Sequence, residues 1–267
     1  MSSYLSLFKI KFINNLQYRS AALAGILTQI FFGLVFIMVY IAFYTSNDNQ
    51  GPIALSQLVT YLWLNQIFFT LVFIFQSEEQ LLTMIRNGNI AYELCRPMNF
   101  YFKWFVTLYA SRIAKVALRF LPVILLALIL PSPYNLSLPY GIKEFIVFLL
   151  ALLLSSLLAT ALSIIYHLLV FYLLDERGIL TLLGVVGEIF SGLTIPIAFF
   201  PEFLKTIAYL LPFHYICDLP FRIYSGNISL SVALPNLIGG LIWLILFGLL
   251  GYMISKQMLK KAVIQGG

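Results

Sequence analysis

Charged residues are scarce in this sequence, and their scarcity excludes most classes of soluble protein. Of the 267 residues, 16 are Lys or Arg and 10 are Asp or Glu, which together make up 10% of the chain. Soluble globular domains carry about 25% charged residues. Hydrophobic residues account for 61% and aromatic residues for 16%. Because so few charges cannot cover a water-exposed surface, we expect a lipid bilayer to surround much of the chain.

Signatures of catalysis, metal binding and nucleotide binding are also missing. No G-x-x-x-x-G-K-[ST] loop occurs, so the chain cannot cradle nucleotide phosphates in that way. The cysteines Cys95 and Cys217 form no motif, and His214, Cys217 and Asp218 cluster without a nucleophile motif. His167 is expected at the opposite end of the topology from His214, which argues against a shared metal site. We therefore predict no catalytic site, no metal site and no cofactor in this chain.

Six apolar runs are long enough to cross a bilayer as helices. A crossing helix needs about 20 mostly apolar residues, and backbone groups in lipid must be bonded internally. The sequence thus predicts an all-α polytopic membrane protein, a single domain over 1–267. The first run is too long for the core of a signal peptide, so we expect it to be retained. The six runs are 21–44, 55–76, 104–130, 145–174, 179–200 and 232–255.

The basic residues predict the orientation, because Lys and Arg are enriched in cytoplasmic loops. With both termini inside, the outer segments hold only Lys143, Lys205 and Arg222. This spread of the net charge of +6 also argues against a nucleic-acid partner. We expect a multi-pass protein of the cell membrane, most simply a bacterial inner membrane. The inner segments hold ten basic residues, Lys9, Lys11, Arg19, Arg86, Arg96, Lys103, Arg177, Lys256, Lys260 and Lys261.

The segment 1–20 is expected to form a helix lying in the inner membrane interface. Leu5, Phe8, Phe12 and Leu16 fall on one stripe of such a helix, with polar residues opposite. The alternative is a disordered lead-in.

The longest cytoplasmic segment, 77–103, is much longer than a connector between two helices requires. Ser77 is a predicted N-cap with Gln80 three residues later, and Glu78 and Glu79 follow in the first turn. Asn87 and Gly88 are predicted to end this helix, and Arg96 is extended because Pro97 follows it. The segment is therefore expected to fold and to contact another molecule.

A second irregular region follows the fifth run, where prolines interrupt an apolar stretch. The helix that fits between them is too short to cross the membrane, so 201–230 is expected to be a re-entrant or interfacial region on the outer side. The prolines concerned are Pro196, Pro201, Pro212 and Pro220.

Four charges lie inside predicted spans, where a charge costs several kcal/mol unless it is paired, protonated or wet. Glu188 either faces a transport pathway or pairs with a cation of the third run. Arg112, Lys115 and Arg119 share one helical face, which could meet anionic lipid, substrate or Glu188. Alternatively Arg112 and Lys115 snorkel to the cytoplasmic interface, whereas Arg119 lies too deep for that.

Small residues recur at helical spacing on two spans and allow close packing. Gly25, Gln29 and Gly33 form such a seam on the first span. On the fourth span the seam is Ala151, Ser155, Ala159, Ser163 and His167.

Two segments together resemble the membrane subunit of ABC-2 type transporters, a class of ABC exporters with six-span permeases. Residues 85–97 read IRNGNIAYELCRP, similar to the family pattern I-x-x-G-x-I-x-x-E-L-x-R-P. Residues 191–213 carry G-x-x-x-P-x-x-x-x-P followed by L-P-F, which resembles the family's outer hairpin. The resemblance implies a hairpin built on Gly192, Pro196, Pro201 and Pro212. It also implies an ATPase-coupling loop that includes Glu78, Glu79, Arg86, Gly88, Glu93, Arg96 and Pro97.

The resemblance further implies partners. The chain would pair with a second permease copy or paralogue, and with separate ABC ATP-binding subunits that hold ATP and Mg. Because the first and fifth spans meet the partner permease in this family, Gly25, Gln29 and Gly33 become a candidate dimer seam. The rival interpretations are a stand-alone secondary transporter or channel that uses the intramembrane charges, and an intramembrane enzyme. The secondary-transporter interpretation lacks support because no second half repeats the broken region.

Overall fold

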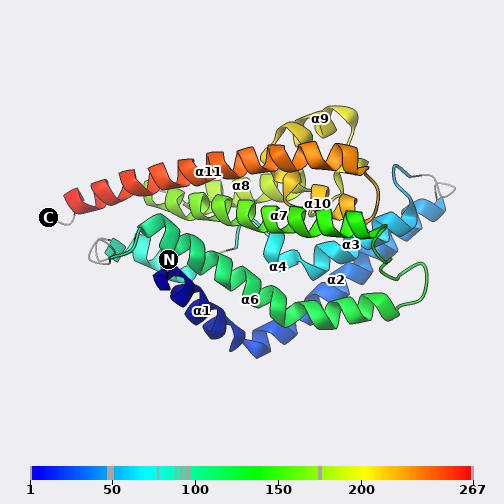
Figure 1. Ribbon diagram of the computed structural model, residues 1–267, viewed down its shortest axis with the longest axis horizontal. Coiled ribbons are helices and arrows are strands. Elements are labelled where there is room, and N and C mark those ends of the chain that lie inside the picture. The colour runs from blue at the N-terminus through cyan, green and yellow to red at the C-terminus, as the bar shows by residue number, and fades with distance from the viewer. Residues whose placement is uncertain are drawn as a thin grey trace.

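The computed structural model describes residues 2–46, 51–76, 78–87, 89–90, 93, 97–173 and 176–265. Across these ranges every element is helical and no strand occurs. Figure 1 shows an elongated bundle in which α6, α7 and α11 run along the long axis, with both termini toward one end. In chain order the elements are α1 (Ser2–Leu16), α2 (Arg19–Ser46), α3 (Leu55–Ile67), α4 (Phe69–Val72), α5 (Glu79–Arg86), α6 (Phe100–Ile129), α7 (Ile142–Leu169), η2 (Val170–Tyr172), α8 (Glu176–Ser191), η3 (Ile197–Phe199), α9 (Glu202–Leu210), η4 (Pro212–Tyr215), α10 (Asp218–Tyr224) and α11 (Leu230–Gln265).

Three stretches among the described residues are long and apolar enough to cross a membrane. They are Arg19–Ser46, Ile142–Tyr172 and Leu230–Lys261, with 28, 31 and 32 residues. At 1.5 Å per residue each exceeds the roughly 30 Å of bilayer hydrocarbon. Large apolar side chains stay exposed along α2 and α11, as expected for lipid-facing helices. These stretches correspond to the first, fourth and sixth predicted runs.

The third predicted run forms a single 30-residue helix, α6. Its N-terminus is capped by Asn99, whose side-chain oxygen accepts a hydrogen bond from the Phe102 N–H at 3.3 Å. Pro122 lies inside the helix without ending it. α6 also carries Arg112, Lys115 and Arg119, which set it apart from the three more apolar helices.

The second predicted run, 55–76, is not one helix, and this corrects the sequence interpretation. α3 spans 13 residues and ends at Ile67, and after Phe68 a four-residue helix, α4, ends at Val72. Residues 73–76 belong to no helix. The break lies inside the fold, where its carbonyl groups are bonded by side chains of α6 and α7.

The fifth predicted run, 179–200, is also shorter than expected. α8 has 16 residues and ends at Ser191. The chain reverses at Gly192, which has a φ of +80° that L residues with a side chain rarely adopt. Short helices then follow, η3, α9, η4 and α10. The predicted interruptions near Pro196, Pro201 and Pro212 are therefore present.

The N-terminal segment is helical as predicted, but with different bounds. α1 ends at Leu16 and α2 already begins at Arg19, two residues before the expected first span. α1 lies against α6 (Figure 1), with Phe8 beside Tyr109 at a ring distance of 6.4 Å. The Ser111 hydroxyl donates to the Asn15 side chain at 3.2 Å and ties the end of α1 to α6.

Buried apolar side chains form two main clusters. The larger one joins α3, α7 and α10 and contains Trp63, Tyr61, Phe148 and Phe221. The other joins α5 to α6, α7 and α11 through side chains that include Leu81, Ile85, Trp104, Leu168 and Met258. The short helix α5 is therefore part of the folded core rather than a loose loop.

Candidate functional site

The helix α5 has one apolar and one polar face. Leu81, Leu82 and Ile85 are buried in the cluster shared with α6, α7 and α11. The opposite face is exposed and includes Glu79, Thr83 and Arg86. On that face the Arg86 guanidinium lies 3.3 Å from the Glu79 carboxylate. α5 is thus anchored on one side and presents a charged surface on the other.

The start of α5 is bonded by a histidine of α7 and not by the side chain of its own cap residue. α5 begins at Glu79 with Glu78 in the cap position, and Glu78 makes no side-chain cap bond. Its backbone N–H donates to His167 Nε2 at 2.9 Å, and His167 Nδ1 lies 2.6 Å from the Ser163 carbonyl oxygen. Nδ1 therefore carries the proton, and Nε2 is free to accept.

The predicted start of this helix is shifted, because Glu78 occupies the cap position. The Gln80 side chain does not turn back to the helix start, because its oxygen accepts a hydrogen bond from Lys11 Nζ at 2.9 Å. Ser77 lies outside the described residues. The role of His167 was missed because nothing local connects it with a residue 89 positions earlier.

Within the rest of the predicted coupling loop, Glu93 forms a buried ion pair with Lys103 at the start of α6. Lys103 Nζ also lies 5.2 Å from the centre of the Trp104 ring. Pro97 is exposed in a bend shortly before α6. Gly88 and Arg96 lie outside the described residues.

Arg112 is completely enclosed, with 1% of its surface exposed, so it does not snorkel to an interface as expected. Its guanidinium donates to the backbone oxygens of Leu71, Phe73 and Ile74 at 3.0, 2.6 and 3.1 Å. A guanidinium carries five N–H donors in a planar fork, which suits it to bond several carbonyls at once. Arg112 thus replaces the helical hydrogen bonds that the chain loses after α4.

The small-residue face of α7 contacts, one after another along the helix, the segment before α10, Arg112, the break after α4 and the start of α5. The Ser155 hydroxyl donates to the Ile216 carbonyl between η4 and α10. The Ala159 carbonyl accepts from Arg112 at 3.4 Å, and the Ser163 hydroxyl donates to the Gln76 carbonyl at 3.4 Å. His167 then accepts from α5. From Ser155 to His167 this line of contacts covers about 18 Å of helix, and all four side chains are fully buried.

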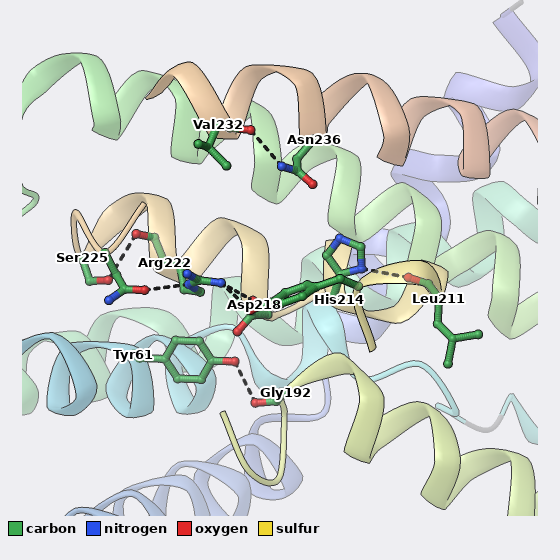
Figure 2. A network of polar contacts seen from close by, with 11 residues as sticks. Tyr61, Gly192, Leu211, His214, Asp218, Arg222, Ser225, Val232 and Asn236 are labelled. Atoms are coloured by element: carbon green, nitrogen blue, oxygen red, sulfur yellow. Dashed lines mark hydrogen bonds and ion pairs between the residues drawn. The ribbon is translucent and has the colours of Figure 1, made fainter. Parts of the chain in front are cut away.

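The segment after α8 is attached to α3 by side-chain hydrogen bonds to its turn (Figure 2). The Tyr61 hydroxyl donates to the Gly192 carbonyl at 2.8 Å. The Asn65 amide donates to the Leu193 carbonyl, also at 2.8 Å. A Cβ on Gly192 would lie 2.5 Å from the Tyr61 hydroxyl oxygen. This turn therefore requires glycine both for its backbone conformation and for space.

A polar network lies in the same region, around Arg222 of α10 (Figure 2). The Arg222 guanidinium bonds Asp218 at 3.3 Å, the Tyr209 hydroxyl at 2.6 Å and the Asn227 side chain at 2.7 Å. Arg222, Asp218 and Tyr209 line a cavity of about 270 Å³ together with His214. Among the described residues no group of three His, Cys, Asp or Glu could hold a metal ion. The network fixes α10 to α9 and to the segment that follows α10.

Glu188 forms no ion pair with the cations of α6 in the described part of the chain. Its side chain is half-buried, whereas Arg112 is bonded to the carbonyls after α4. Arg119 lies against α2, with Nη2 3.5 Å from the Ala21 carbonyl oxygen. The structure therefore does not bring together the proposed pair of Glu188 with Arg112, Lys115 or Arg119.

Gly25, Gln29 and Gly33 of α2 face other helices of the same chain. A Cβ on Gly25 would overlap the Arg119 guanidinium. A Cβ on Gly33 would lie 3.1 Å from both Gln66 and Trp63 of α3. Gln29 between them is 4% exposed. The seam thus packs α2 against α3 and α6.

Long apolar helices, together with broken helices that are fastened by buried side chains, define a multi-pass membrane protein. The chain belongs to the ABC-2 family of transporter proteins, because the model of that family, described as "ABC-2 family transporter protein", matches residues 22–266. It is accordingly a permease component of an ABC transporter. Among curated proteins none matches the chain.

Proposed function

We propose that this permease crosses the bacterial plasma membrane six times with both termini in the cytoplasm, and that it works as one half of an ATP-driven exporter. A second copy or a paralogue would complete the pathway, and separate ABC subunits would bind ATP and Mg. The distribution of Lys and Arg supports the orientation, and both termini lie toward one end of the bundle in Figure 1. α3 with α4, and α8 with the segment after it, would cross as broken helices, which membrane proteins tolerate where the backbone is enclosed by protein.

In this proposal the polar face of α5 docks on the ATPase. The observation that carries it is the division of α5 into a face buried in the permease core and a charged face left in solvent. A helix anchored on one side can pass a push from its partner to the helices on which it rests. His167 and the buried face of α7 would carry that push toward α10, and the segment around Gly192, Pro196, Pro201 and Pro212 would shape the outer gate.

A charge exchange on α5 tests the docking. In the double variant Glu79→Lys with Arg86→Glu, the two side chains can still pair, so the fold loses little, because exposed ion pairs contribute at most about 1 kcal/mol. The charges offered to a partner are reversed, and like charges that face each other across an interface cost several kcal/mol. We expect capture of the P-loop ATPase by the tagged permease to fall by about tenfold or more.

The matched control is the exposed pair of α9, Glu202 and Lys205, which are 2.8 Å apart. Its exchange, Glu202→Lys with Lys205→Glu, should leave ATPase capture unchanged. If both exchanges reduced ATPase capture equally, or if neither reduced it, α5 would not be the docking site.

One observation favours a second function, that of a stand-alone secondary transporter. Discontinuous helices that meet inside the membrane are typical of secondary transporters, and the chain has two broken runs. Glu188, half-buried on an apolar helix, would then serve as an ion-binding group. The capture experiment separates the two functions, because a stand-alone transporter retains no P-loop ATPase even with its natural α5 sequence.

A further inference from the structure

A cavity of about 330 Å³ lies where α1 meets α2, next to the start of α5 and one face of α6. Residues from all of these elements line it, among them Tyr18, Ala21, Glu78, Lys115 and Arg119. Ser111 and Asn15, bonded to each other at 3.2 Å, also belong to its wall. It is separate from the polar network around Arg222.

Within the described part of the chain, the charged side chains that line this cavity share it without forming ion pairs with one another. Among the described residues, neither Lys115 nor the Glu78 carboxylate forms an ion pair or a side-chain hydrogen bond. Arg119 makes a single long bond to a carbonyl, and its buried Nε has no partner in the described structure. Two basic groups one helical turn apart therefore share a cavity with one unpaired acid.

The balance of charge favours an anionic occupant. Glu79, which also lines the cavity, is already engaged by Arg86 at 3.3 Å. Burial raises the pKa of Glu78, and Lys115 and Lys11 act against that rise. Lys115 and Arg119 thus outnumber the one uncommitted carboxylate, and a single negative charge would leave the cavity neutral.

The surroundings of the cavity suit an amphipathic molecule. Tyr18, at the junction of α1 and α2, is 67% exposed, and Leu23 and Leu27 on the next turns of α2 are 60% and 64% exposed. Acyl chains could lie along these side chains while a headgroup enters the cavity. An inner-leaflet position depends on the proposed topology, whereas the binding itself does not.

We propose that this cavity binds the phosphodiester headgroup of an anionic phospholipid through Lys115 and Arg119. The Glu78 carboxylate would face the same headgroup and carries the same sign of charge. Because Glu78 directly precedes α5, lipid binding would be linked to the position of the start of α5. An occupied cavity neutralises the two cations that otherwise attract Glu78. The lipid thereby acts on the helix proposed to receive the ATPase.

Native mass spectrometry of the full-length permease in detergent, titrated with phosphatidylglycerol, tests this site. Lys115→Gln and Arg119→Gln should each weaken binding by about fivefold, the contribution of one basic residue near an anionic lipid surface. Glu78→Gln should strengthen binding, because it removes the like charge. Lys205→Gln on exposed α9 is the control and should bind as the natural sequence does.

Two further titrations identify the ligand. Phosphatidylcholine should bind more weakly than phosphatidylglycerol to the natural sequence, and inorganic phosphate should not displace the lipid. Equal binding of both lipids, equal binding by all variants, or displacement by inorganic phosphate would overturn the proposal. The measurement needs no ATPase, so its failure leaves the docking experiment unaffected, and the reverse also holds.

Discussion

Arg112→Met is expected to lower the melting temperature of the detergent-solubilised permease by on the order of 10 °C. Methionine fills much of the volume of arginine but offers no donor to the carbonyls of Leu71, Phe73 and Ile74. A buried polar group left without a partner costs about 1–3 kcal/mol. Three such groups together predict a loss of about 3 kcal/mol or more, within the range for breaking a buried polar network.

Two other variants make this result specific. Arg112→Lys should fall between the natural sequence and Arg112→Met, because a single ammonium cannot span three carbonyls. Arg119→Met removes a charge from the same helix but only one bond of 3.5 Å, so it should change the melting temperature little. If Arg112→Met and Arg119→Met both have the melting temperature of the natural sequence, the break after α4 does not depend on Arg112.

His167→Leu is expected to separate ATPase docking from the motion of the permease. Leucine keeps the apolar packing of α7 on the cluster around α5, but the Glu78 N–H loses its acceptor. Coupling between distant sites is typically worth about 1–3 kcal/mol, a factor of about 5–150. We therefore expect the ATP-dependent response near α9 to fall by about tenfold, while capture of the ATPase stays within about twofold.

The response can be measured without knowledge of the cargo. Spin labels at Leu210 and Ile129, which are 77% and 82% exposed, report the distance between α9 and the end of α6. In the natural sequence ATP and Mg should shift the distance distribution, and in His167→Leu the shift should be nearly absent. His167→Gln, whose amide oxygen can accept from the Glu78 N–H, should restore part of it. A full shift in His167→Leu would remove the α7 contact from the mechanism.

The long helices were predictable because they depend on composition alone. The first predicted run, 21–44, became α2 at Arg19–Ser46, and the sixth, 232–255, lies within α11. The turn at Gly192 and the neighbouring prolines also left a local signal. By contrast, Pro122 interrupts nothing, because α6 continues through it.

The break in the second run had no local signal, since 55–76 contains neither proline nor glycine. It is stabilised by Arg112, about forty positions later, through bonds that only the tertiary fold creates. A buried arginine must find hydrogen-bond acceptors, so Arg112 within an apolar run was a signal, which we interpreted as a position at the membrane interface. The spacing of Gly25 and Gly33 predicted a packing face on α2, but it could not identify α3 and α6 as the neighbours of that face.

Site-specific photocrosslinking can show whether the ATPase docks on α5. A photoactivatable residue would replace Thr83, on the exposed face of α5, or Leu138, 77% exposed in the segment between α6 and α7. We expect a covalent adduct with the P-loop ATPase from position 83 and none from position 138. An adduct from position 138 and none from position 83 would contradict both the docking site and the orientation of the chain in the membrane.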